Sequence, residues 1–169
     1  ILDNFNQKFD TKLLDISDKV DKDDHRLLIK GTSAVSLGAI NAGMQFYCYY
    51  PITPASDTGD LLDHWKEKAN IIVEQAEDEL CAINSVIGAG RTGVRSMTGT
   101  AGPGFDLKSE ALGMAIMTED PVVIMLAQRP GPSTGLPTRG DQSDLMLALN
   151  AGHGGGERIV LMAGDVTDC

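Results

Sequence analysis

Short apolar runs alternate with longer segments of helical period along most of this chain. The runs predict buried strands, which we expect at residues 27–30, 46–49, 71–73, 94–98, 121–127 and 158–162. Apolar residues with helical spacing predict helices at 33–44, 57–65, 80–90, 105–117 and 142–150. Strands that alternate with helices through short connections form parallel sheets covered on both faces. The pattern therefore predicts an α/β fold with helices on both faces of a parallel sheet.

The first 26 residues differ from the rest, being dense in Asp, Lys and Asn. Phe9, Leu13, Ile16 and Val20 fall on one helical stripe, whereas the composition fits a solvated linker equally well. We expect a linker or N-terminal extension at 1–26 and one domain at 27–169. Because the chain stops just after an expected strand, we also expect this domain to continue further.

Composition narrows the class of protein. The chain has 169 residues, 42% hydrophobic and 22% charged, with a formal net charge of −10, which disfavours nucleic acid and anionic membranes as partners. No apolar run is long enough to span a membrane. The cysteines, Cys48, Cys81 and Cys169, show no paired spacing, so we expect a reduced, cytoplasmic protein without its own iron–sulfur or zinc site.

An acidic cluster stands between the expected strand at 71–73 and the helix after it. Glu77, Asp78 and Glu79 are consecutive, and carboxylates at a helix N-terminus are stabilised by free amide groups and the helix dipole. The plain interpretation is good helix chemistry alone. Ligands of open α/β sheets, however, also bind at the carboxyl ends of strands.

Two further connections carry unusual residues. Prolines flank Thr53 in the segment Tyr50-Pro51-Ile52-Thr53-Pro54, which indicates a rigid loop that presents one hydroxyl, or simply a stiff turn. The segment 98–105, Thr-Gly-Thr-Ala-Gly-Pro-Gly-Phe, predicts a glycine-rich turn at 100–104 that lets the backbone approach a flat ligand. Its spacing matches neither a P-loop nor a dinucleotide fingerprint.

A long proline-rich loop follows the most apolar expected strand. Arg129 opens this loop at 128–140, and an arginine there can bind a carboxylate through two parallel hydrogen bonds. An exposed loop arginine is the alternative. Loops of this length in compact domains are more often functional than not.

Six ordered motifs now identify a family resemblance. They are YPITP, QAEDE, TGTAGPGF, SEALGMA, QRPGPSTGLPT and GDQSDLMLAL. Over 27–169 the chain resembles the α subunit of 2-oxoacid:ferredoxin (acceptor) oxidoreductases, the 2-oxoglutarate type most of all. The resemblance implies the pyrimidine-binding domain fold of thiamine-diphosphate enzymes. Ala55 stands where Ser is common in the family.

The resemblance also implies roles for individual residues. Glu79 falls where the family has the glutamate that contacts the aminopyrimidine ring. Thr53 and Arg129 fall where the family binds the 2-oxoacid. The cofactor-binding positions that it implies are Tyr50, Pro51, Ile52, Glu79, Gly102 and Pro103.

The family's activity is coenzyme A-dependent oxidative decarboxylation of a 2-oxoacid, with electrons passing to ferredoxin. The family's magnesium–diphosphate motif is missing, because Gly164-Asp165-Val166 does not match it. We therefore expect no metal here, and expect a β subunit to hold Mg²⁺, the diphosphate and the iron–sulfur clusters in a dimer of heteromers. Two alternatives stay open: pyruvate or a branched-chain 2-oxoacid as substrate, and a non-catalytic α/β binding module. Convergence of Glu79, Thr53 and Arg129 on one cleft would favour the enzyme over the module.

Overall fold

Helices and strands alternate along the folded chain. The computed structural model describes residues 28–169, so the linker or helix expected at 1–26 lies outside the described residues. The elements are α2 (Gly31–Asn41), β1 (Phe46–Tyr49), α3 (Ser56–Ala69), β2 (Ile72–Gln75), α4 (Glu79–Arg91), β3 (Ser96–Ala101), α5 (Gly102–Thr118), β4 (Val123–Ala127) and α6 (Asp144–Asn150).

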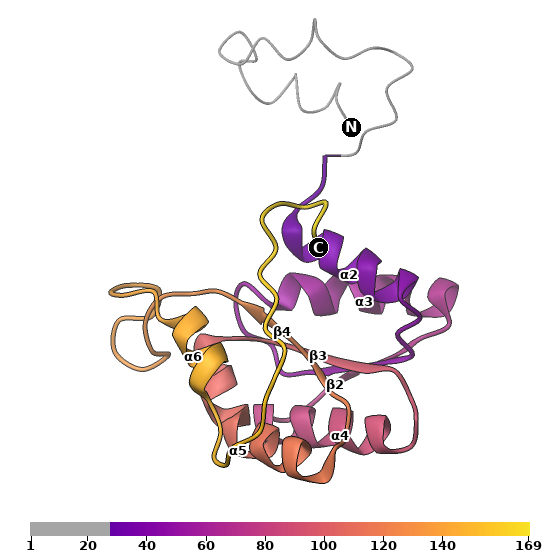
Figure 1. Cartoon of the computed structure of the whole chain (residues 1–169). Coiled ribbons are helices and arrows are strands. Elements are labelled where there is room, and N and C mark those ends of the chain that lie inside the picture. The colour runs from indigo at the N-terminus through magenta and orange to yellow at the C-terminus, as the bar shows by residue number, and fades with distance from the viewer. Residues whose placement is uncertain (1–27) are drawn as a thin grey trace, which may run out of the picture.

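The four strands form one parallel sheet in the order β2-β1-β3-β4. Helices α2 and α3 cover one face of the sheet, and α4 and α5 cover the other (Figure 1). This arrangement confirms the predicted fold class. The chain first adds β2 on one side of β1 and then places β3 on the other side, so the order of strands reverses between β1 and β3.

Two apolar layers hold the helices to the sheet. On one face, Tyr47 and Tyr49 of β1 pack with Leu62 of α3. On the other, Ile83 of α4 packs with Ala111 of α5. Fully burying a large apolar side chain stabilises a fold by about 1.5–3 kcal/mol, and these layers fix the helix positions from which the site is built.

The strand predicted at 27–30 is wrong for the part that the structure describes. Residues 28–30 form no strand, and the Leu28 side chain is 95% exposed. Helix α2 begins directly at Gly31 and ends at Asn41. A strand forms only where it can pair with a neighbour, and residues 28–30 pair with none of the four strands.

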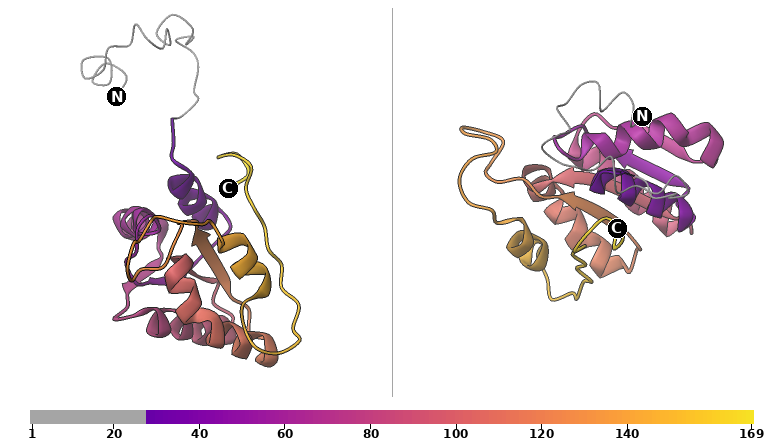
Figure 2. Two further views of the ribbon diagram at one scale, coloured as in Figure 1. Left: turned by 90° about the vertical axis from the view of Figure 1, so that its left-hand side faces the viewer. Right: turned by 90° about the horizontal axis from the view of Figure 1, so that it is seen from above.

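The strand predicted at 158–162 is also wrong. This segment passes β4 and continues to α2 without pairing (Figure 2). A cavity of about 650 Å³ lies between it and the domain, lined by Ile124 and Leu126 of β4 and by Ile159 and Leu161 of the segment. The segment therefore stays too far from β4 to form ladder hydrogen bonds, and Ile159 and Leu161 are each 88% exposed.

The glycine-rich turn predicted at 100–104 does not form. Strand β3 continues to Ala101, and α5 begins at Gly102 with Pro103 in its first turn, where the fixed backbone of proline suits a helix start. A Cβ on Gly102 would lie 2.2 Å from an Asp144 carboxyl oxygen. The glycine therefore permits close packing against α6, and the strand passes directly into the helix.

Candidate functional site at the carboxyl edge of the sheet

The predicted site residues all lie in the connections that leave one edge of the sheet. Because the strands are parallel, their carboxyl ends meet at the same edge. Tyr50, Pro51, Ile52 and Thr53 follow β1, Glu79 opens α4 after β2, Gly102 and Pro103 open α5 after β3, and Arg129 follows β4. The loops after β1 and β3 flank the reversal in strand order, where ligands of open α/β sheets bind.

Glu79 differs from the two acids before it. Asp78 is the N-cap of α4, and its exposed side chain accepts a hydrogen bond from the Cys81 main-chain N–H at 2.6 Å. Glu77 is exposed as well. Glu79 is the first residue of the helix and only 7% exposed. The plain helix-capping interpretation therefore accounts for Asp78 but not for the buried Glu79, whose predicted place at a strand-to-helix junction is confirmed.

The Glu79 carboxyl packs against the first turn of α5. A Cβ on Gly104 would lie 2.8 Å from Glu79 Oε1 and 2.2 Å from Thr100 Oγ1. Within residues 28–169, no hydrogen bond reaches the carboxyl oxygens of Glu79. A shielded carboxyl without an internal partner remains available to a ligand that brings one.

Thr53 and Arg129 meet across the site. Arg129 Nη1 donates a hydrogen bond to the main-chain oxygen of Thr53 at 3.1 Å, although the two residues are 76 positions apart. Arg129 Nη2 donates to Ser133 Oγ at 3.3 Å. Arg129 Nε is buried without a partner in the described part of the chain. The guanidinium is therefore anchored beside the exposed Thr53.

Asp144, at the start of α6, is a site residue that sequence reasoning missed. Its side chain is 4% exposed, and its Oδ2 accepts hydrogen bonds from the Arg129 main-chain N–H at 2.6 Å and from Gln142 Nε2 at 2.9 Å. It also packs against Gly102. Nothing in the sequence around Asp144 indicates that this acid is buried, because only the fold brings it into contact with Arg129.

Lys108 of α5 is a second residue that was missed. It is fully buried, and burial lowers the pKa of its ammonium group to about 8. Its position four residues after Gly104 was a usable signal, because such pairs share one face of a helix.

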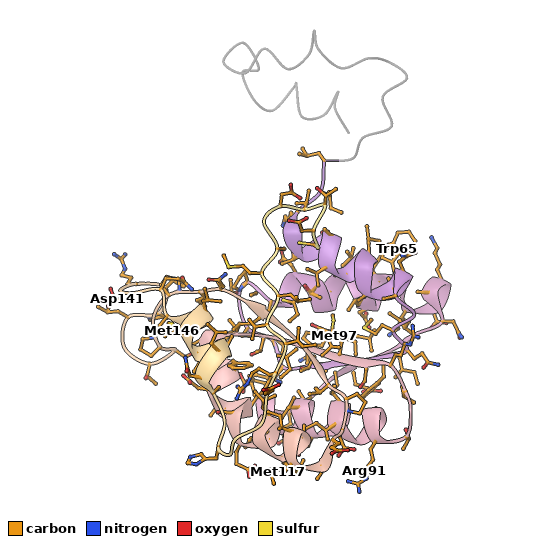
Figure 3. All side chains as sticks on the ribbon, viewed as in Figure 1. Trp65, Arg91, Met97, Met117, Asp141 and Met146 are labelled. Atoms are coloured by element: carbon orange, nitrogen blue, oxygen red, sulfur yellow. The ribbon has the colours of Figure 1, made fainter. Side chains whose placement is uncertain are left out.

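The predicted residues lie together where the carboxyl ends of the strands meet. Arg129 contacts Thr53 directly, and Asp144 and α5 link this pair toward Glu79. Neither the cavity beneath the C-terminal segment nor one of about 430 Å³ beside Val94 and Arg95 is lined by Glu79, Thr53 or Arg129. Asp141, in the loop at this edge, lies far from Arg91 at the other end of α4 (Figure 3).

A metal-binding cluster and a membrane-spanning helix are both absent from residues 28–169. No cluster of three or more His, Cys, Asp or Glu side chains there is arranged to hold a metal ion. No helix in that range combines the length and apolar character needed to cross a bilayer.

Comparison with known proteins identifies the family. Residues 37–169 match the model of the thiamine-diphosphate-binding domain of pyruvate flavodoxin/ferredoxin oxidoreductases. The chain belongs to this family. The parallel sheet and the helices on both of its faces are thus the fold of a thiamine-diphosphate-binding domain, as the resemblance implied.

Relatives of this thiamine-diphosphate-binding domain carry consistent names. The chain is 51% identical over 156 residues to the α subunit of 2-oxoacid:ferredoxin oxidoreductase 1 of Sulfurisphaera tokodaii, covering 85% of the chain and 25% of that protein. It is 45% identical over 141 residues to the 2-oxoglutarate synthase subunit KorA of Archaeoglobus fulgidus, covering 83% of the chain and 41% of that protein. The chain thus spans a quarter to two fifths of the length of these relatives.

A solved structure shows the same likeness. The 2-oxoglutarate:ferredoxin oxidoreductase of Magnetococcus marinus, with 2-oxoglutarate, coenzyme A and succinyl-CoA bound, superposes with a TM-score of 0.76 at 41% identity. The match covers 99% of this chain and 33% of that one.

The residues at the edge fit the cofactor of this family. Glu79 offers a shielded carboxyl without an internal hydrogen bond, and the missing side chain of Gly104 leaves it room. A shielded carboxyl is suited to share a proton with a ring nitrogen.

Proposed function

We propose that this chain is part of the α subunit of a 2-oxoacid:ferredoxin oxidoreductase, with residues 27–169 as its pyrimidine-binding domain. The enzyme catalyses coenzyme A-dependent oxidative decarboxylation of a 2-oxoacid, 2-oxoglutarate in the first place, and passes electrons to ferredoxin. The observation that carries this proposal is the burial of Glu79 at the first turn of α4, beside two exposed acids.

Glu79 acts on the pyrimidine half of the cofactor. Its carboxyl would share a proton with a ring nitrogen. Thiamine diphosphate would supply the carbon nucleophile and the electron sink for decarboxylation. Tyr50, Pro51 and Ile52 after β1, and Gly102 and Pro103 at the start of α5, would help to hold the ring.

Thr53 and Arg129 bind the 2-oxoacid. The Arg129 guanidinium pairs with the substrate carboxylate, and its contacts to Thr53 and Ser133 hold it in one orientation. The Thr53 hydroxyl donates a hydrogen bond to a substrate oxygen. Holding the substrate at two points lowers the entropy cost of aligning the 2-oxo carbon with the cofactor.

The partners are a β subunit, ferredoxin and coenzyme A. The β subunit holds the diphosphate, Mg²⁺ and the iron–sulfur clusters, and the complex is a dimer of heteromers in the cytoplasm. The exposure of Thr53 supports a shared site, because a partner surface would be needed to exclude water from it. The free cysteines Cys48, Cys81 and Cys169 agree with a reducing compartment.

The choice of 2-oxoglutarate is supported by two relatives whose names include it. Pyruvate or a branched-chain 2-oxoacid is the alternative, supported by a relative named only for 2-oxoacids.

A direct test uses the assembled enzyme with pyruvate, 2-oxoglutarate and a branched-chain 2-oxoacid. We expect coenzyme A-dependent ferredoxin reduction with the highest kcat/KM on 2-oxoglutarate. Arg129→Lys should raise KM by ~10-fold or more, since it loses the two-pronged carboxylate contact. Arg139→Lys, in the exposed part of the same loop, is the matched control and should leave KM unchanged. Failure to oxidise any 2-oxoacid would contradict the proposal.

A further inference from the structure

Lys108 is a fully buried lysine with no role in the function proposed so far. Its side chain is 0% exposed, and lysines are almost never fully buried unless they are paired. Its Nζ donates hydrogen bonds to the main-chain oxygen of Glu79 and to Thr98 Oγ1, each at 3.2 Å. Both acceptors belong to other elements, so Lys108 joins α5 to the first turn of α4 and to β3.

Helix α5 thereby contacts both the side chain and the backbone of Glu79. Gly104 and Lys108 are four residues apart and lie on one face of the helix. Gly104 packs against the Glu79 carboxyl, and Lys108 binds the Glu79 carbonyl. The backbone and the side chain of Glu79 are therefore both fixed by one rigid element.

The charge of Lys108 also acts on Glu79. Burial lowers the pKa of Lys108, whereas the charges of Glu79, Cys48 of β1 and Asp78 at the N-cap of α4 raise it, leaving it at about 8. The ammonium group is therefore mostly charged at neutral pH, and its hydrogen bond to the Glu79 carbonyl is charge-assisted.

We propose that Lys108 is a positioning residue that holds Glu79 in place for thiamine diphosphate. The inference rests on the proposed role of Glu79. The alternative is a lysine that only ties α5 to α4, and the two roles predict different results when Lys108 is replaced.

The test uses Lys108→Met in the assembled enzyme, because Met keeps most of the length without the charge. Calorimetry should show at least ~10-fold weaker binding of thiamine diphosphate with Mg²⁺, the effect of losing one hydrogen bond from a charged group. Turnover at saturating thiamine diphosphate should fall as well, because a displaced Glu79 is no longer aligned with the cofactor. Hydrogen exchange of the α4 and α5 amides should stay as in the wild type.

Two controls run in parallel. Lys66→Met removes the same charge from the exposed face of α3 and should change none of these readouts. Glu79→Gln should weaken cofactor binding. If Lys108→Met does not assemble, Lys108→Gln, which keeps an N–H donor, should show the same weakening to a smaller extent.

The outcomes separate the claims. Weaker binding together with faster exchange in α4 would mean a merely structural lysine and would overturn the inference. Unchanged binding in Lys108→Met, with Glu79→Gln impaired, would overturn the inference and leave the proposed function standing. If Glu79→Gln also binds the cofactor normally, the proposed function fails as well.

Discussion

Glycine at position 104 determines how much room the Glu79 carboxyl has. A Cβ there would lie 2.2 Å from Thr100 Oγ1 and 2.8 Å from Glu79 Oε1, closer than van der Waals contact allows. Gly104→Ala should therefore displace the carboxyl, and an overpacking cost of about 1–3 kcal/mol corresponds to roughly 10-fold weaker cofactor binding or more. Calorimetric titration of the assembled enzyme with thiamine diphosphate measures the effect.

Gly88 is the matched control for this prediction. It lies within α4, and a Cβ there would meet nothing within 4 Å. Gly88→Ala should leave cofactor binding unchanged and stabilise the fold by about 0.5–1 kcal/mol, the usual gain for alanine over glycine within a helix. Equal cofactor affinity in the two variants would show that Gly104 does not position Glu79.

The buried charge of Lys108 predicts a dependence of stability on pH. The pKa of Lys108 is about 8 in the fold against 10.5 for the free side chain, so the unfolded chain binds more protons between these values. The free energy of unfolding should therefore rise with pH across this window, and below it the buried charge costs about 3 kcal/mol. Urea unfolding should show this rise between pH 8 and 10.5 in the wild type and its absence in Lys108→Met. An equal rise in both proteins would contradict the assignment.

At the scale of single residues, the sequence identified Glu79 but not Lys108, which binds it. The family resemblance selected Glu79 among the three acids, and in the structure α4 begins at Glu79, after Glu77 and Asp78. Lys108 binds Glu79 from 29 residues away, and Asp144 binds Arg129 from 15 away. Contacts of this kind depend on how helices pack, which no local pattern encodes.

At the scale of elements, α6 holds the start of the loop at 128–140 through the side chain of Asp144. Asp144 accepts the Arg129 main-chain N–H, and its loss would leave that donor unpaired at a cost of about 1–3 kcal/mol. Asp144→Ala should therefore raise KM for the 2-oxoacid about 10-fold with a smaller change in kcat. Steady-state kinetics of the assembled enzyme, with the exposed Asp141→Ala as control, measures this. Equal effects of Asp144→Ala and Asp141→Ala on KM would show that Asp144 does not position Arg129.

The elements that form the sheet were predictable, and those at its margins were not. Runs such as 46–49 and 121–127 are apolar; the first becomes β1, and the second contains all of β4. The run at 158–162 is similarly apolar, yet it stays unpaired. Apolar composition indicates that a segment suits a strand, whereas pairing depends on whether a free strand edge lies within hydrogen-bonding distance.

At the scale of the whole molecule, Glu79, Thr53 and Arg129 lie where the carboxyl ends of the strands meet, and they line neither of the two cavities described above. The α chain purified without partner subunits should therefore bind thiamine diphosphate with Mg²⁺ at least ~100-fold more weakly than the assembled enzyme, a difference of about 2.7 kcal/mol. Isothermal calorimetry of both forms in the same buffer tests this. Tight, magnesium-dependent binding by the α chain alone would refute a site shared between subunits.

The central claim is that Glu79 is the working acid, and three amide substitutions in the assembled enzyme test it most directly. Glu79→Gln keeps the volume of the side chain but loses the proton-sharing carboxyl, so 2-oxoacid-dependent ferredoxin reduction should fall by at least ~100-fold. Glu77→Gln and Asp78→Asn change exposed acids and should cost far less, since charges at a helix terminus contribute about 0.3–1 kcal/mol. If Glu77→Gln lost most of its activity while Glu79→Gln stayed near wild type, the working acid would be Glu77 instead of Glu79. If all three variants kept wild-type activity, the account would be contradicted.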